Sequence, residues 1–134
     1  MTAFGALDGQ KYLNLETYRK NGRGVRTPVW FAAASAAAPQ AVAPILYVYT
    51  TDGSGKAKRI RNLSAVKIAP CDARGNVTGS WIGANAEIVG GEEARTGMRL
   101  LDRKYWPWKQ LIGVFSMFSG RHQRVVLAIR AASP

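Results

Sequence analysis

The feature that most constrains the fold of this chain is a strand pattern, a glycine-rich turn and a basic segment in direct succession. Residues 47–51 are aromatic or β-branched, which favours a pleated and partly buried strand. Asp52-Gly53 and Ser54-Gly55 then allow a sharp turn and a close approach of the backbone to a ligand. A helix is expected over residues 56–63. Its first N–H groups and its dipole favour an anion at this point.

Polar side chains accompany this turn. Thr50, Thr51 and Ser54 supply hydroxyl groups and Lys56 supplies an ammonium group, and together they could reach one phosphate. A plain connection between a strand and a solvated basic helix explains the same spacing, because short glycine motifs often match by chance. From the spacing alone, both interpretations stay open.

The rest of the chain predicts a mainly β domain with short helices. Asn21-Gly22 favours a hairpin turn between two strands. Pro28 cannot donate to a ladder, so it predicts a sheet edge, a bulge or a ligand beside it. Gly79 and Gly83 predict a bend or bulge in a long strand. Strands are expected over residues 13–18, 25–33, 45–51, 65–71, 77–89 and 124–131, and further helices over 8–13 and from Glu92 to Pro107. Residues 111–118 are apolar and are assigned to no element.

The length and charge of the chain limit its organisation and its partners. A chain of 134 residues predicts a single domain spanning residues 1–134. Its net charge is +11, from 19 Lys and Arg against 8 Asp and Glu, which implies an anionic partner. Nucleic acid is the usual candidate for such a balance. Since the densest cationic cluster follows the glycine turn, we favour a phosphorylated cofactor and expect no nucleic-acid partner.

Several function classes leave no signal in this sequence. His122 is the single histidine, Cys71 is the single cysteine, and no Gly-x-Ser-x-Gly motif occurs. We therefore expect neither a catalytic triad nor a metal site, and we interpret Cys71 as a packed thiol. No apolar run is long enough to span a bilayer, and residues 1–6 lack the pattern of a secretory signal. These observations predict a cytoplasmic protein without a membrane partner.

The order of the motifs resembles a known family. Residues 49–57, Tyr-Thr-Thr-Asp-Gly-Ser-Gly-Lys-Ala, look like the strand-and-loop signature of the pyridoxamine-5′-phosphate-oxidase-like split-barrel oxidoreductases. Residues 22–31, 66–71, 74–75 and 104–106 resemble the branch of that superfamily whose members are thought to use a deazaflavin coenzyme. The resemblance runs from about Tyr12 to Tyr105.

The resemblance implies a split β-barrel that forms a homodimer with cofactor sites between the subunits. It implies an oxidoreductase that uses the deazaflavin coenzyme F-420, with FMN as the alternative cofactor, to pass hydride to or from a small organic substrate. A non-catalytic flavin or deazaflavin carrier and a basic nucleic-acid-binding module are the other hypotheses.

The family also implies a role for each matching residue. Thr27, Pro28 and Val29 would lie against the cofactor, and Tyr49, Thr50 and Thr51 would line the neighbouring strand. The phosphate would be held by Ser54, Lys56 and Lys58, with Arg59 or Arg61 as a further cationic contact.

The chain also departs from its FMN-using relatives. Gly55 stands where they usually carry Arg, Trp30-Phe31 stands where they carry Lys, and their glutamine falls near Gly79 or Ser80. Trp30 and the aromatic residues of 104–108 could flank a flat ring, but we favour a role in the core or at a subunit interface.

Overall fold

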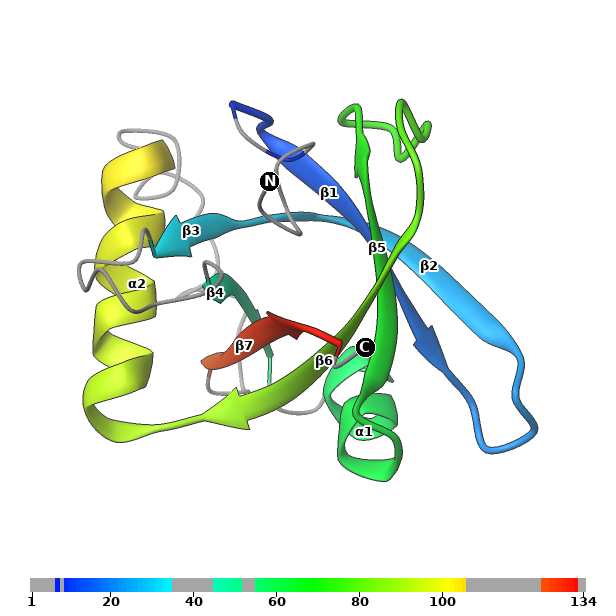
Figure 1. Cartoon of the computed structure of the whole chain (residues 1–134). Helices are drawn as coiled ribbons and strands as arrows, with labels where there is room; N and C mark the ends of the chain where they lie inside the picture. The colour runs from blue at the N-terminus through cyan, green and yellow to red at the C-terminus, as the bar shows by residue number, and fades with distance from the viewer. Residues whose placement is uncertain (1–6, 8, 35–44, 52–54, 106–123, 133–134) are drawn as a thin grey trace.

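One curled antiparallel sheet and two helices make up the described part of the chain, which comprises residues 7, 9–34, 45–51, 55–105 and 124–132 of a computed structural model (Figure 1). In chain order the elements are β1 (Tyr12–Tyr18), β2 (Gly24–Trp30), β3 (Ala32–Ala34), β4 (Ile45–Thr51), α1 (Gly55–Asn62), β5 (Ala65–Cys71), β6 (Ile82–Val89), α2 (Gly91–Tyr105) and β7 (Arg124–Ala131).

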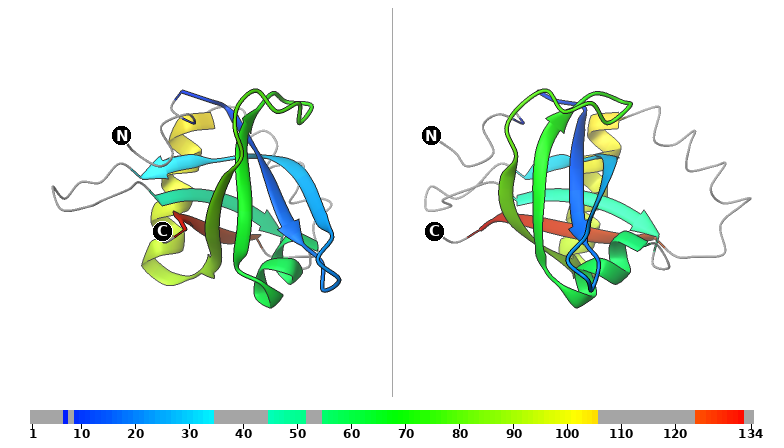
Figure 2. Two further views of the ribbon diagram at one scale, coloured as in Figure 1. Left: turned by 45° about the vertical axis from the view of Figure 1, so that its right-hand side comes forward. Right: turned by 90° about the vertical axis from the view of Figure 1, so that its right-hand side faces the viewer.

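The two edges of the sheet are joined by a single residue. The strand order is β2-β1-β5-β6-β7-β4-β3, so β2 and β3 lie at opposite edges. They are nevertheless consecutive in the chain, and only Phe31 separates them. The long curved path from β2 into β3 crosses the molecule in every view (Figure 2). This connection bends the sheet into a barrel.

The barrel is split on one side. β3 pairs with β4 only where Ala32–Ala34 faces residues 45–47, whereas β4 continues to Thr51. Among the described strands, β2 pairs only with β1. The second half of β4 and the edge of β2 therefore face each other without a hydrogen-bonded ladder.

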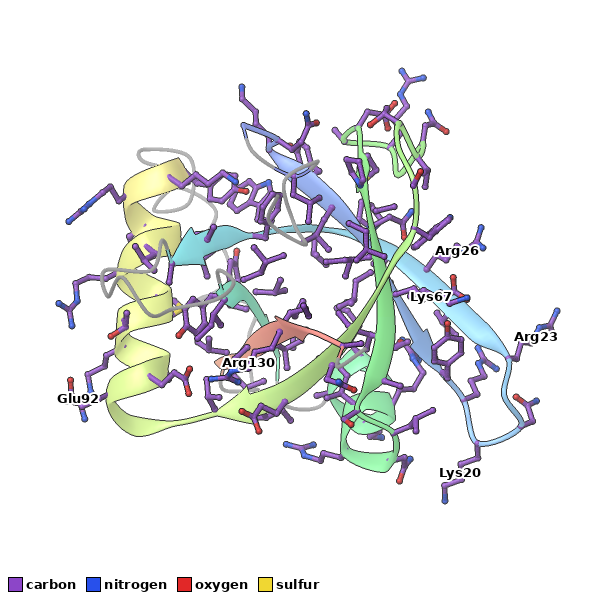
Figure 3. All side chains as sticks on the ribbon, in the orientation of Figure 1. Lys20, Arg23, Arg26, Lys67, Glu92 and Arg130 are labelled. Atoms are coloured by element: carbon purple, nitrogen blue, oxygen red, sulfur yellow. The ribbon has the colours of Figure 1, made fainter. Side chains whose placement is uncertain are left out.

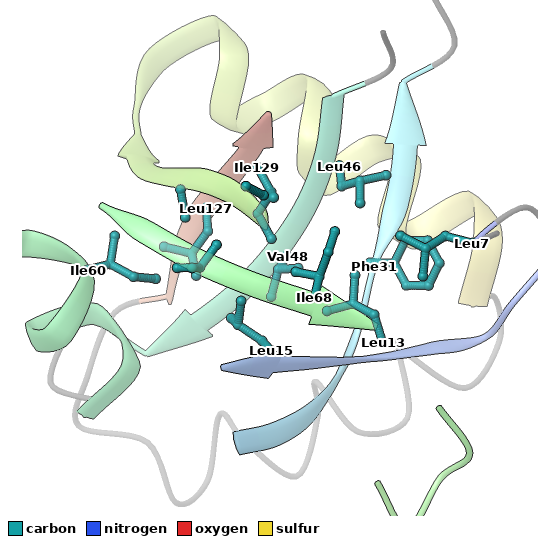
Figure 4. Close-up of a cluster of buried hydrophobic side chains, with 13 residues drawn as sticks. Leu7, Leu13, Leu15, Phe31, Leu46, Val48, Ile60, Ile68, Leu127 and Ile129 are labelled. Atoms are coloured by element: carbon teal, nitrogen blue, oxygen red, sulfur yellow. The ribbon is translucent and has the colours of Figure 1, made fainter. Parts of the chain in front are cut away.

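The core fills the interior of the barrel. Alternate residues of each strand point inward, as the period of two in a strand requires. They include Leu13 and Leu15 of β1, Leu46 and Val48 of β4, and Leu127 and Ile129 of β7, all at most 1% exposed (Figure 4). Ile60 of α1 joins the same cluster, so this helix covers one end of the barrel.

Helix α2 packs on the outer surface of β3, β4 and β7. Gly97 allows this close approach, because an added Cβ would lie 2.9 Å from Tyr47 and from Val126. The Tyr47 hydroxyl donates to Glu93 at 2.9 Å, and Arg130 donates to the same carboxylate at 2.8 Å. The helix is thus held by packing in its middle and by a polar network near its N-terminus.

Much of the predicted secondary structure is confirmed. The strands over residues 45–51, 65–71 and 124–131 have the expected bounds, and the helices after Gly55 and before Pro107 are present. The Asn21-Gly22 hairpin joins β1 to β2, with Gly22 at a φ of 86°. Pro28 lies on an edge strand, which is one of the positions that its missing N–H predicted. Cys71 is a buried thiol, and burial raises its pKa.

One predicted element is wrong, and two others differ from the structure in their bounds. The helix expected over residues 8–13 fails because Gly9 has a φ of 76° and β1 begins at Tyr12. The strand expected over 25–33 is two strands, since the chain leaves one sheet edge at Phe31 and joins the other. The strand expected from Val77 becomes regular only at Ile82, after an isolated bridge between Val77 and Cys71.

Packing explains the late start of that last strand. An added Cβ on Gly79 would lie 2.6 Å from the Pro70 ring, so the segment crosses close above β5 rather than pairing regularly with it. His122 and residues 111–118 lie outside the described residues.

Candidate functional site

A cavity of about 280 Å³ lies at the split between β2 and β4. The edge strand contributes Pro28, Val29 and Trp30, while β4 contributes Tyr49 and Thr50. The remaining wall comes from Tyr12 of β1, Lys56 of α1 and Ala73 of the turn after β5. The opening exists because β3 is short and Pro28 has no N–H to offer a neighbouring strand.

Five of the residues implied by the resemblance border this cavity: Pro28, Val29, Tyr49, Thr50 and Lys56. Thr27 belongs to β2 but does not line it, and neither do Lys58 and Arg61, which are exposed on α1. Thr51 ends β4, and Ser54 lies outside the described residues. The structure therefore brings together four of the six predicted strand residues and one of the predicted cations at this cavity.

The cationic end of the cavity is formed by the first turn of α1. Lys56 borders the cavity, and burial, followed by repulsion from Arg59, lowers its pKa. The Arg59 side chain folds back over the same turn, so that an added Cβ on Gly55 would lie 2.6 Å from its Nη1 atom. Its Nε donates to the buried Thr17 hydroxyl at 2.6 Å. Burial and then Arg19 lower the pKa of Arg59.

These contacts crowd positive charge at a helix N-terminus, where a bound anion would relieve the mutual repulsion. Further exposed cations, Lys20, Arg23, Arg26 and Lys67, lie on the side of the β1–β2 hairpin (Figure 3). Cations are dispersed along the sequence, but the fold places several of them on α1 and beside the β1–β2 hairpin (Figure 3).

Aromatic rings form the opposite wall. Trp30 borders the cavity and stacks on Tyr105 of α2, with ring centroids 4.6 Å apart and an interplanar angle of 7°. Tyr12 and Tyr49 complete the aromatic lining. Aromatic faces of this kind suit a flat ligand. We predicted a core or interface role for Trp30. The structure shows that this residue packs against α2 and also borders the cavity.

A rigid turn carries Ala73 to the rim. Asp72 Oδ1 accepts hydrogen bonds from the N–H groups of Arg74 and Asn76, each at 2.9 Å. Asn14 Nδ2 donates to the Gly75 carbonyl at 2.9 Å and fastens the turn to β1. Sequence reasoning assigned no site role to Tyr12 or Ala73. No local signal marks them, because barrel closure and this turn decide their positions.

The lining of this cavity favours particular ligands by its charge and by its flat apolar surfaces. Within the described residues, no three His, Cys, Asp or Glu side chains are grouped to hold a metal ion. An ammonium group at one end and aromatic and apolar surfaces at the other favour a flat ligand with an anionic group. None of the described helices has the length and apolar character needed to cross a membrane.

Comparisons with known proteins agree with the fold. No family model and no curated protein matches the sequence. Among solved structures, a putative pyridoxamine 5′-phosphate oxidase from Listeria innocua matches with a TM-score of 0.62 and 12% identity, over 97% of this chain and 90% of the other. An F420 reductase matches with a TM-score of 0.56 and 18% identity, over 97% and 93%.

The heme storage protein HutZ from Vibrio cholerae matches with a TM-score of 0.66 and 13% identity, over 94% of this chain and 84% of that protein. At such low identities these similarities establish the fold alone. The chain has the split-barrel fold of pyridoxamine-5′-phosphate-oxidase-like proteins, as the resemblance implied.

Proposed function

We propose that this protein is an oxidoreductase that binds a flavin-type cofactor in the cavity at the barrel split, and that the cofactor is the deazaflavin coenzyme, with FMN as the alternative. One observation carries the proposal: a half-buried lysine at a helix N-terminus and a stacked tryptophan border the same cavity. Of the solved structures named above, the F420 reductase and the pyridoxamine 5′-phosphate oxidase support a cofactor of this type.

The residues present fit such a group. A cavity of about 280 Å³ is close to the lower end of the range for small-molecule sites, which is roughly 300–1,000 Å³. It could accept part of a planar ring system, and the rest of the molecule would lie outside the cavity. When bound, a cofactor of this type supplies hydride transfer that no side chain of the site could perform.

The chain contributes binding and orientation. Lys56 and the first N–H groups of α1 would hold a phosphate, with Arg59 as a second cation over the same turn. Pro28 and Val29 would support one edge of the ring and exclude water from it. Trp30 and Tyr49 would restrict its tilt.

The deazaflavin assignment rests on the family segments and on the excess of positive charge. A coenzyme with a phosphodiester and an acidic tail matches that charge better than one with a single phosphate. A homodimer with shared sites and a small organic substrate belong to the same proposal, and an electron-poor or unsaturated substrate would accept the hydride.

The first experiment replaces the cavity cation. Lys56→Ala should weaken binding of FMN and of the deazaflavin coenzyme by about 10- to 150-fold, because a charge-assisted hydrogen bond contributes roughly 1.5–3 kcal/mol. Lys67→Ala removes the same charge from an exposed position on β5 and is the matched control. Absorbance and fluorescence titration measure the dissociation constants of both variants for each cofactor. Equal effects of the two substitutions would contradict a specific phosphate site.

A second experiment separates the cofactors and the functions. Competitive titration at low and high salt should show preference for the deazaflavin coenzyme, with its binding weakened more by salt than that of FMN, since exposed charge pairs are screened over about 10 Å at 0.1 M. Preference for FMN at both salt concentrations would overturn the deazaflavin assignment. Tight binding without turnover of any electron acceptor would favour the carrier.

A further inference from the structure

The residue that joins the two sheet edges needs hydrogen-bond partners from outside the sheet. Phe31 lies between β2 and β3 and belongs to neither strand, yet it is only 2% exposed. Buried backbone groups without partners are costly. Its N–H donates to the Tyr105 hydroxyl at 3.0 Å, and its carbonyl oxygen lies 2.8 Å from the same hydroxyl. The last residue of α2 therefore completes the backbone hydrogen bonds of this joint.

Lys104 reinforces the same point. Although the residue is exposed overall, its ammonium group donates to the Phe31 carbonyl at 2.8 Å and to the Gln10 carbonyl at 2.7 Å. It also lies 3.7 Å from the centre of the Phe31 ring. Burial lowers the pKa of Lys104 to about 8, as expected for an ammonium group that has lost hydration. Two consecutive side chains of α2 thus converge on one peptide unit.

This joint is connected to the cavity by the neighbouring residue. Trp30 immediately precedes Phe31, borders the cavity and stacks on Tyr105. The Tyr105 hydroxyl also lies 2.6 Å from the Lys11 carbonyl, next to the cavity residue Tyr12. Burial raises the pKa of Tyr105, so the phenol stays protonated and keeps its donor. Tyr105 therefore contacts both the Trp30 ring and the backbone of the residue that follows it.

We propose that Tyr105 and Lys104 are positioning residues that hold the Phe31 joint and set the Trp30 ring against the planar part of the bound cofactor. This inference rests on the proposed function. It predicts that the end of α2 controls recognition of the ring, whereas Lys56 controls recognition of the phosphate. The two contributions come from different elements of the cavity wall, β2 and α1, and should be separable.

Riboflavin and FMN separate the two contributions, because they share the ring and differ in the phosphate. Tyr105→Phe keeps the stacking surface and removes the hydroxyl, so it should weaken both ligands by about the same factor, roughly 3- to 10-fold. Lys104→Met should act in the same direction on both. Lys56→Ala should weaken FMN and leave riboflavin within about twofold. Arg103→Met, at the exposed neighbouring position of α2, is the control and should change neither.

A readout independent of binding guards against a purely structural effect. Acrylamide quenching of Trp30 fluorescence, in a background where the other three tryptophans are Phe, should increase in Tyr105→Phe and Lys104→Met at temperatures where both variants remain folded. Unchanged quenching and unchanged riboflavin affinity in both variants would overturn the inference. The proposed function would still stand after such a result if the unmodified protein binds FMN and Lys56→Ala weakens that binding. Failure of the unmodified protein to bind riboflavin, FMN and the deazaflavin coenzyme would instead refute the proposed function.

Discussion

Gly97 offers a sharp test of how α2 is attached to the barrel. A Cβ added at this position would lie 2.9 Å from Cγ and Cδ1 of Tyr47 and 2.9 Å from Cγ1 of Val126. All of these atoms belong to side chains that are at most 3% exposed. Neither side chain can move away freely. The Tyr47 hydroxyl is hydrogen-bonded to Glu93, and the backbone of Val126 is paired with β4 in the sheet.

The expected magnitude follows from two opposing effects. Alanine favours a helix interior over glycine by about 0.8–1 kcal/mol. Overpacking a well-packed core costs about 1–3 kcal/mol. For Gly97→Ala we therefore expect a net loss of about 1 kcal/mol in the free energy of unfolding. Gly97→Val places two more methyl groups in this contact than Gly97→Ala does, and valine favours a helix less than alanine. We therefore expect it to lower the free energy of unfolding by about 2–4 kcal/mol.

Urea and thermal unfolding at a fixed protein concentration measure these losses. For a chain of this length, each kcal/mol corresponds to about 3–5 °C in Tm. Gly83→Ala is the control, because this glycine of β6 is exposed and an added Cβ would meet no atom within 4 Å. It should be neutral or slightly stabilising, by at most about 1 kcal/mol. If Gly97→Ala stabilises the protein as much as the control does, the close packing of α2 on the sheet is wrong.

Three further predictions concern the network, the site and the assembly. Burial and the hydrogen bond to Glu93 raise the pKa of Tyr47 to about 12, above the value of about 10 expected when unfolded, so the free energy of unfolding should fall by roughly 1–2 kcal/mol as pH rises from 10 to 12. Urea unfolding across that range should give a shallower fall for Tyr47→Phe, and equal slopes would contradict the assignment. Gly55→Val should displace the Arg59 guanidinium and weaken FMN binding, as measured by titration. Unchanged FMN affinity would show that the turn only connects β4 to α1. Sedimentation at micromolar concentration should give about twice 14.6 kDa, and a clean monomer would remove the shared-site proposal.

Local patterns were sufficient for much of the secondary structure and for part of the candidate site. The β-branched and aromatic run of β4, followed by two glycines and Lys56, predicted a strand, a turn and a cationic helix start. The structure has the strand and the helix on either side of that turn. The Asn21-Gly22 hairpin was equally predictable, because both residues tolerate positive φ. Such signals depend on neighbours in the chain, so they can be recognised without the fold.

Long-range contacts decided the remainder. Residues 25–33 have one continuous strand pattern, and nothing local shows that Phe31 leaves one sheet edge to join the other. The partners that make this possible, Tyr105 and Lys104, are more than 70 residues away. Tyr12 and Ala73 reach the cavity only because the sheet closes. The sequence by itself determined most of the segments that extend and predicted where an anion could bind. Only the tertiary structure determined which side chains meet, because barrel closure brings together residues that share no local pattern.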